Sequence, residues 1–262
     1  MIKKTILGIE AFDSILGGLY RGRSAVCTGR HGTGKTILAL QSMAAAVASG
    51  EKPLMLTGWQ ASDLAIIAQS AAGFPLDEAL GNGHAVLMEY AGMETQQGEI
   101  NITLPPDSFT ELLQAVEERG VSRVIFDTVL PWVAIPGEER LPKHIYSFIQ
   151  ALDRMGVTSL MTIPRPVSPL SVKLLDLLTE QAPVVISLDF GSDPSQRLLT
   201  VSKYLGETSL PPPIRLKLGD GQGFFSEEQE QNRPTFQPDG KSHEKGHIRF
   251  ARAFNSVSRG PA

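Results

Sequence analysis

The feature that most restricts the fold of this chain is an eight-residue glycine-rich segment that runs from Gly29 to Thr36. Its residues, in order, are Gly29, Arg30, His31, Gly32, Thr33, Gly34, Lys35 and Thr36. An apolar run precedes the segment and an alanine-rich run follows it, so the pattern predicts a buried strand, a tight loop and the start of a helix. The glycines permit backbone conformations that turn amide hydrogens towards the inside of the loop.

The same residues match the pattern G-x-x-x-x-G-K-[ST] of a phosphate-binding loop, or Walker A motif. A helix N-terminus is a ready anion site, and the Lys35 ammonium would reach the β- and γ-phosphates of a nucleotide. The Thr36 hydroxyl is a hard oxygen ligand that suits Mg²⁺. We therefore predict that the segment binds ATP with Mg²⁺, without excluding GTP, because base contacts lie outside the loop. The alternative is a glycine-rich turn that binds nothing.

A second apolar run, residues 124–128, contains Asp127 near its end. An acidic residue at the end of a buried strand is typical of a Walker B strand, in which it holds Mg²⁺ or a water molecule on that ion. We predict that Asp127 joins Thr36 in holding Mg²⁺. An aspartate that only caps a loop is the alternative.

Strand-like and helix-like runs alternate through most of the chain. This alternation predicts an α/β fold with a mainly parallel sheet and helices on both of its faces. The last two runs flank a Gly-Ser-Asp-Pro turn and predict an antiparallel hairpin at one edge of the sheet. The expected strands are 23–29, 53–58, 84–90, 122–128, 157–163, 184–190 and 198–203, and the expected helices are 34–49, 62–72, 107–119, 142–155 and 169–180.

The character of the sequence changes near residue 226. We expect residues 1–225 to form one nucleotide-binding domain and residues 226–262 to form a polar, flexible tail without a clear hydrophobic period. Residues 247–254 within that tail are basic and aromatic. They suggest either a docking segment or, as we favour, a solvated part of the tail.

Composition narrows the class of protein. Hydrophobic residues make up 42% of the chain, which is enough for a packed core, and the net charge of −4 argues against a dedicated nucleic-acid-binding surface. The single cysteine, Cys27, precludes an intrachain disulfide and suits a reducing compartment. The sequence has no signal peptide and no apolar stretch of membrane-spanning length, so we expect a cytoplasmic protein without a membrane partner.

The loop and its surroundings resemble the RecA-like ATPases and, within them, the KaiC domain family. This resemblance covers residues 1–225 and rests mainly on the loop and on the N-terminal segment before it. It implies a RecA-like core in which the strand carrying Thr162 lies between the loop strand and the Asp127 strand. It also implies a homo-oligomer, usually a hexameric ring, with ATP sites between subunits. The residues that carry it are 7–13, 17–19, 22–23, 29–36, Asp127, 156–162 and 201–206.

The chain departs from the family pattern after its second strand, where relatives commonly carry glutamates that activate the attacking water. Trp59 and Gln60 stand there instead. A glutamine can hold a water by hydrogen bonds, but it cannot accept a proton as a base. Gln60 is therefore a candidate for orienting the water, with Glu89 and Glu94 as alternative bases.

A second departure concerns the groups that reach a neighbouring subunit's γ-phosphate. The family often shows Lys-x-Arg before a glycine. Lys203 keeps the lysine as a candidate acting in trans, whereas Leu205 replaces the arginine. Thr162 is a candidate γ-phosphate sensor or an ordinary β-branched strand residue. Arg165 is a candidate interface cation, although we favour an exposed loop arginine.

These observations leave three hypotheses for function. The first is a regulatory nucleotide switch that hydrolyses ATP weakly or not at all and is recognised by a protein partner. The second is an active RecA-like ATPase. The third, supported by fold analogy alone, is a DNA-associated recombinase or mediator, against which the acidic balance argues.

Overall fold

The computed structural model describes residues 3–90, 106–133, 138–226 and 247–249. Within these ranges a ten-stranded sheet has the order β11-β10-β9-β8-β3-β7-β6-β4-β5-β12. Neighbouring strands are parallel throughout the run β8-β3-β7-β6-β4-β5-β12. At the other edge each of the pairs β8-β9, β9-β10 and β10-β11 is antiparallel. The strands are β3 (Ser24–Gly29), β4 (Pro53–Thr57), β5 (Val86–Glu89), β6 (Arg123–Asp127), β7 (Thr158–Pro164), β8 (Val184–Phe190), β9 (Gln196–Tyr204), β10 (Ile214–Gly219), β11 (Gly223–Phe225) and β12 (His247–Arg249).

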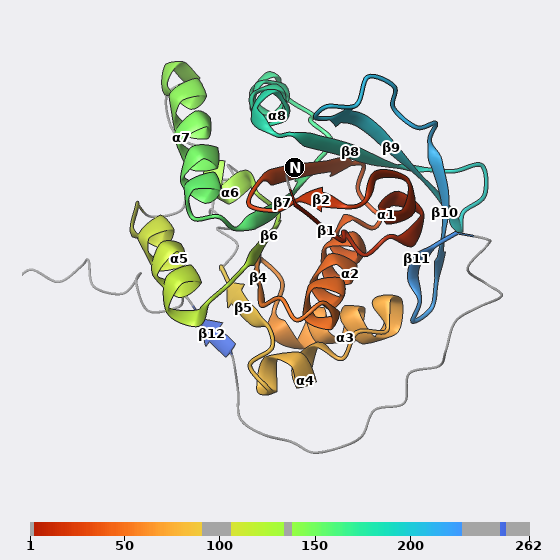
Figure 1. The fold of residues 1–262 in the computed structure, drawn as a ribbon, viewed down its shortest axis with the longest axis horizontal. Coiled ribbons are helices and arrows are strands. Elements are labelled where there is room, and N and C mark those ends of the chain that lie inside the picture. The colour runs from red at the N-terminus through yellow and green to blue at the C-terminus, as the bar shows by residue number, and fades with distance from the viewer. Residues whose placement is uncertain (1–2, 91–105, 134–137, 227–246, 250–262) are drawn as a thin grey trace, which may run out of the picture.

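Helices cover both faces of the sheet (Figure 1). One hydrophobic core lies under α1 to α4, and a second lies under α5 to α8. The predicted α/β fold class is therefore confirmed, including the antiparallel edge. The helices are α1 (Glu10–Leu16), α2 (Lys35–Ala48), α3 (Ala61–Ala72), α4 (Leu76–Gly81), α5 (Pro106–Arg119), α6 (Leu130–Val133), α7 (Leu141–Arg154) and α8 (Pro169–Gln181), with a 3₁₀ turn at Glu138–Arg140.

The central strands are buried on both faces, which explains why their sequences are continuous apolar runs. Every residue of β4 and of β6 is buried. β7 lies between β3 and β6, in agreement with the strand order that the family resemblance implied. Parallel strands end at the same edge of the sheet, so Gly29 of β3 and Asp127 of β6 are brought to one edge.

Some elements were not expected from the sequence. The short helices α1 and α4 and the edge strands β10 and β11 were not among the predicted elements, because their local patterns are weak. A small separate sheet pairs β1 (Lys4–Thr5) with β2 (Leu19–Tyr20). Three residues of the segment expected to be a flexible tail form β12, which pairs with β5.

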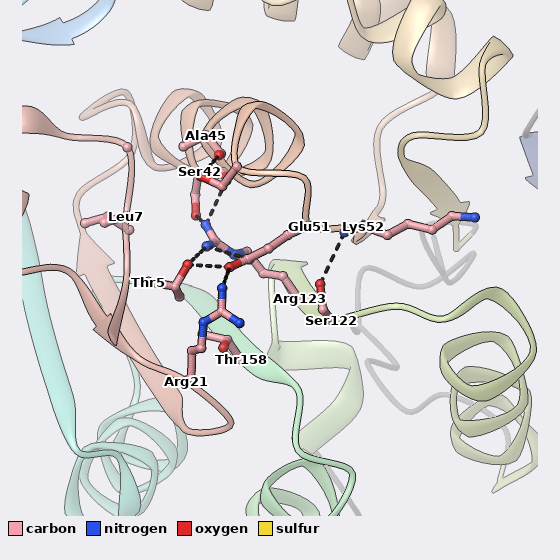
Figure 2. A network of polar contacts seen from close by, with 12 residues as sticks. Thr5, Leu7, Arg21, Ser42, Ala45, Glu51, Lys52, Ser122, Arg123 and Thr158 are labelled. Carbon is pink, nitrogen blue, oxygen red and sulfur yellow. Dashed lines mark hydrogen bonds and ion pairs between the residues drawn. The ribbon is translucent and has the colours of Figure 1, made fainter. Parts of the chain in front are cut away.

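A buried polar network lies at the opposite end of the sheet from Gly29 and Asp127. Figure 2 shows its centre, the guanidinium of Arg123, which is fully buried at the start of β6. Arg123 forms a 2.8 Å ion pair with Glu51 and donates hydrogen bonds to Thr5 Oγ1 and to Ser42, while Arg21 contacts Glu51 from the solvent side. These contacts join the N-terminal segment, α2 and β6.

None of the helices in the described ranges combines the length and apolarity that crossing a membrane requires.

Candidate nucleotide-binding site

The glycine-rich loop leaves β3 at Gly29 and enters α2 at Lys35. Gly34, which precedes α2, has a φ of 99°, and a Cβ on it would lie 2.6 Å from Cζ of Phe224. A Cβ on Gly29 would lie 2.5 Å from the carbonyl oxygen of Leu188. Only glycine fits these two positions without displacement of their neighbours, so the close packing around the loop accounts for its composition.

Lys35 lies over the loop. Its Nζ donates hydrogen bonds to the carbonyl oxygens of Gly29 (2.9 Å) and Arg30 (2.7 Å). Burial lowers the pKa of the Lys35 ammonium, and the nearby Cys27 and Asp127 partly offset that effect. The Lys35 ammonium is thus bound to two carbonyl oxygens of the chain itself, and a phosphate oxygen can replace either of these bonds.

Asp127 ends β6 in a buried position. Its Oδ1 accepts a 2.9 Å hydrogen bond from Thr162 Oγ1, whereas no described residue forms a hydrogen bond of good geometry with its buried Oδ2. Burial raises the pKa of the carboxyl, and the hydroxyls of Thr36 and Thr162 and the charge of Lys35 lower it. A buried carboxylate oxygen without a hydrogen bond of good geometry is costly, and a cation or a water molecule would satisfy it.

The donor set fits Mg²⁺. Asp127 Oδ2 and the Thr36 hydroxyl are hard oxygen ligands, and the Thr36 hydroxyl is close enough to Asp127 to favour its charged form. The two predicted metal ligands therefore meet at one edge of the sheet, next to Lys35.

Thr162 lies inside β7 rather than at its end, and its hydroxyl is directed to Asp127 instead of being exposed. The backbone carbonyl of Thr162 also accepts a 2.8 Å hydrogen bond from Thr128 Oγ1. In this arrangement Thr162 orients the carboxylate of Asp127.

Trp59 and Gln60 follow β4 and are both exposed. Gln60 is the N-cap residue of α3, without a side-chain capping bond. Glu89, the alternative base, ends β5, and its Oε1 accepts a 2.6 Å hydrogen bond from the backbone amide of Ala61, at the start of α3. Glu94 lies outside the described residues.

The candidate trans group Lys203 is half-buried on β9. Its Nζ donates to the carbonyl oxygens of Thr179 (2.9 Å) and Glu180 (2.7 Å), where it caps the end of α8. Leu205 is exposed, as is Arg165, whose backbone amide binds the carbonyl of Gly29. The side chains of Arg30 and His31 are also exposed, so their backbones contribute more directly to the loop.

An arginine that no sequence motif indicated also supports the loop. Arg197 of β9 is buried, and its guanidinium donates to the carbonyl oxygens of Thr33 (3.2 Å) and, at a longer 3.5 Å, Gly32. It also packs over the ring of Phe190 at 4.7 Å. Holding these two carbonyls on the outside of the loop keeps its amides directed inwards. The separation of 164 residues between Arg197 and Thr33 explains why no local pattern revealed the contact.

A second support comes from β11. Gln41 of α2 donates through Nε2 to the carbonyl of Phe224 (2.9 Å) and accepts through Oε1 from its amide (2.8 Å). The ring of Phe224 fills the space beside Gly34. The edge hairpin thereby fixes the first turns of α2 under the loop.

Comparison with known proteins gives a consistent assignment. The chain is 23% identical over 225 residues to the circadian clock oscillator protein KaiC of Prochlorococcus marinus subsp. pastoris. It is 27% identical over 168 residues to the KaiC of Rippkaea orientalis. The first match covers 84% of this chain but 44% of the relative, and the second covers 63% and 32%. The chain thus spans less than half the length of these curated relatives.

The fold has a solved counterpart in a KaiC-like protein from Pyrococcus horikoshii OT3. The TM-score is 0.69 at 20% identity, and the match covers 86% of this chain and 99% of the other. The pattern of the family described as "ATPase: KaiC" matches residues 5–208, which is more than half of this chain. The chain therefore belongs to the KaiC family of ATPases and has its ATP-binding, RecA-like domain.

Proposed function

We propose that the protein is a regulatory nucleotide switch that binds MgATP and hydrolyses it slowly. The observation that carries the proposal is a contrast within one site. The loop, Lys35, Thr36 and Asp127 are assembled for binding, whereas Trp59 and Gln60 occupy the positions at which the resemblance places catalytic glutamates.

Each binding residue has a role in this proposal. The loop amides and the N-terminus of α2 surround the phosphates, and Lys35 exchanges the carbonyls of Gly29 and Arg30 for phosphate oxygens. Thr36 and Asp127 would hold Mg²⁺, which neutralises charge on the phosphates. Arg197 keeps the loop in shape without contacting the nucleotide.

Slow hydrolysis follows from what the site lacks. Gln60 can hold a water molecule but cannot remove its proton, and a general base contributes a factor of about 10² to 10⁴. Leu205 stands where the family often has an arginine, and Lys203 is engaged by the carbonyls at the end of α8. A neighbouring subunit would therefore add little catalytic charge.

A switch needs a readout. We propose that MgATP binding assembles or stiffens a homo-oligomer, of hexameric form as the family resemblance implies, and that a protein partner recognises this state. Its relatives are named circadian clock oscillator proteins, which is consistent with a regulatory role. We propose that the protein is cytoplasmic and that nucleic acid is not its target.

The test compares wild type, Lys35→Ala and Gln60→Glu. MgATP binding, phosphate release and oligomer size by light scattering are measured in the same samples. We expect the wild type to bind and assemble with little release, Lys35→Ala to bind poorly, and Gln60→Glu to raise release by about tenfold or more at similar affinity. Brisk release by the wild type that Lys35→Ala abolishes would instead support an active ATPase. Salt-sensitive binding of single-stranded DNA would support the recombinase hypothesis.

A further inference from the structure

One buried tyrosine binds the backbone that follows Asp127. The Oη of Tyr90 accepts a 2.9 Å hydrogen bond from the amide of Thr128 and lies 3.0 Å from the carbonyl oxygen of Asp127 and 3.1 Å from that of Thr128. It thus pairs with both polar groups of the peptide that joins the two residues. The Tyr90 side chain belongs to the segment after β5, 37 residues away in sequence.

Tyr90 is itself held firmly. Its backbone amide donates to the carbonyl of Thr57 at the end of β4, and its ring meets Trp132 edge-on, with the ring centres 6.4 Å apart. A Cβ on Gly58 would lie 3.4 Å from the Tyr90 ring, so the ring also packs against the chain that leads to Trp59. Burial raises the pKa of Tyr90, which keeps the phenol protonated and able to donate.

The carboxyl group of Asp127 is therefore fixed from two sides. Thr162 holds Oδ1 of the side chain, and Tyr90 holds the peptide on which that side chain is mounted. With both in place, the remaining oxygen, Oδ2, keeps one direction, and none of the described residues gives it a hydrogen bond of good geometry. A side chain that is already oriented before the ion binds loses less conformational entropy on binding it.

We propose that Tyr90 is a positioning residue that orients Asp127 for Mg²⁺ and links this orientation to the segment carrying Trp59 and Gln60. This inference rests on the proposed function, in which Asp127 holds the ion. Tyr90 contacts the ends of both β4 and β6, so this one residue joins the chain at Thr57 and Gly58 to the backbone of the metal ligand.

The test uses Tyr90→Phe, which removes only the hydroxyl. ATP binding is measured without metal, in chelator, and then as a function of Mg²⁺ concentration. We expect metal-free ATP binding to stay at the wild-type level, while the Mg²⁺ concentration for half-maximal enhancement rises by about three- to tenfold, as for the loss of one or two hydrogen bonds.

Two further variants distinguish an error in the role of Tyr90 from an error in the metal site itself. Tyr204→Phe is the matched control, because the Tyr204 hydroxyl is also buried and binds two carbonyl oxygens, those of Leu16 (2.9 Å) and Gly18 (2.7 Å), away from Asp127. It should lose stability without shifting the Mg²⁺ titration. Asp127→Asn should remove the enhancement by Mg²⁺.

If Asp127→Asn keeps that enhancement, the proposed metal site is wrong, and the role of Tyr90 falls with it. If Asp127→Asn removes the enhancement but Tyr90→Phe titrates like the wild type, only the role of Tyr90 is overturned. Loss of metal-free ATP binding in Tyr90→Phe would also overturn it, since Tyr90 would then support the whole site rather than the metal ligand.

Discussion

The hydroxyl of Thr162 on β7 donates a 2.9 Å hydrogen bond to Oδ1 of Asp127 on the neighbouring strand β6. Both residues are buried, and the bond helps to keep the carboxylate charged against the cost of its burial. A hydroxyl engaged in this way is not directed at a γ-phosphate. The relationship favours a role for Thr162 in positioning Asp127 over the sensor role considered from the sequence.

Replacing Thr162 with valine should weaken MgATP and MgADP binding alike, by about three- to tenfold, because one hydrogen bond to the metal ligand is lost at unchanged shape. Thr162→Ser keeps the hydroxyl and should bind almost as the wild type does. Equilibrium binding of both nucleotides, with and without Mg²⁺, measures the effect. A variant that loses only the discrimination between ATP and ADP would instead point to a sensor.

Asp127→Asn should change how stability depends on pH in the absence of nucleotide and Mg²⁺. Burial raises the folded-state pKa of Asp127 above its ordinary value of 3.8, so the ionised carboxylate destabilises the fold. Below the unfolded-state pKa the carboxyl is protonated in both states, so no free energy is lost to a buried charge. As the pH rises through the folded-state pKa, the folded protein comes to carry the full free-energy cost of the buried carboxylate.

The melting temperature of Asp127→Asn relative to wild type should therefore increase as the pH rises above about 4, the ordinary pKa of aspartate, and should level off once the pH has passed the raised folded-state pKa. Thermal melts at several pH values measure this difference. Saturating MgATP should remove the advantage by stabilising the wild type. A constant offset between the two proteins at every pH would contradict a raised pKa.

The sequence was sufficient for the parts of the site that depend on local pattern. The loop, the buried strand ending in Asp127 and the strand–helix alternation each lie within a short window, where periodicity and glycine spacing are informative. Tyr90, Arg197 and Phe224 could not be predicted in the same way. Their partners are 37, 164 and 183 residues away, so only the folded topology brings them together.

Short elements escaped prediction for a related reason. α4 has six residues and β11 has three, too few for a hydrophobic period to be recognised. β11 is stabilised by the bonds of Phe224 to Gln41 on a distant helix rather than by its own propensity. Glu89 shows that residue type alone does not reveal which groups a side chain contacts. Its residue type suggested a base, but the fold brings its carboxylate at the end of β5 to the amide of Ala61 at the start of α3, a hydrogen bond that only the structure reveals.

Arg197→Met should reduce ATP affinity by about tenfold or more, because it removes charge-assisted hydrogen bonds that hold the outer carbonyls of the loop. Methionine keeps much of the side-chain volume, so the change is mainly the loss of donors. Arg215→Met on the adjacent strand β10 is the control, since Arg215 is exposed. ATP titrations well below both melting temperatures measure the effect. Equal affinities of the two variants would show that Arg197 does not support the loop.

Arg123→Met should have the opposite profile, a large loss of stability with little change in nucleotide affinity. Removing one partner of a buried ion pair costs about 3 to 5 kcal/mol, because Glu51 is left buried without its main cation. Asp127 lies four residues further along β6 from Arg123, at about 3.3 Å per residue, so the loss occurs roughly 13 Å from the metal ligand.

Urea unfolding and ATP titration of the same preparations test this separation. Arg21→Met is the matched control, since Arg21 binds the same Glu51 from an exposed position and should contribute less than about 1 kcal/mol. If Arg123→Met weakened ATP binding as strongly as Arg197→Met, the two ends of the sheet would be coupled. Stability and nucleotide binding would then not be separable along β6, and the buried network at Arg123 would have to be counted as part of the site.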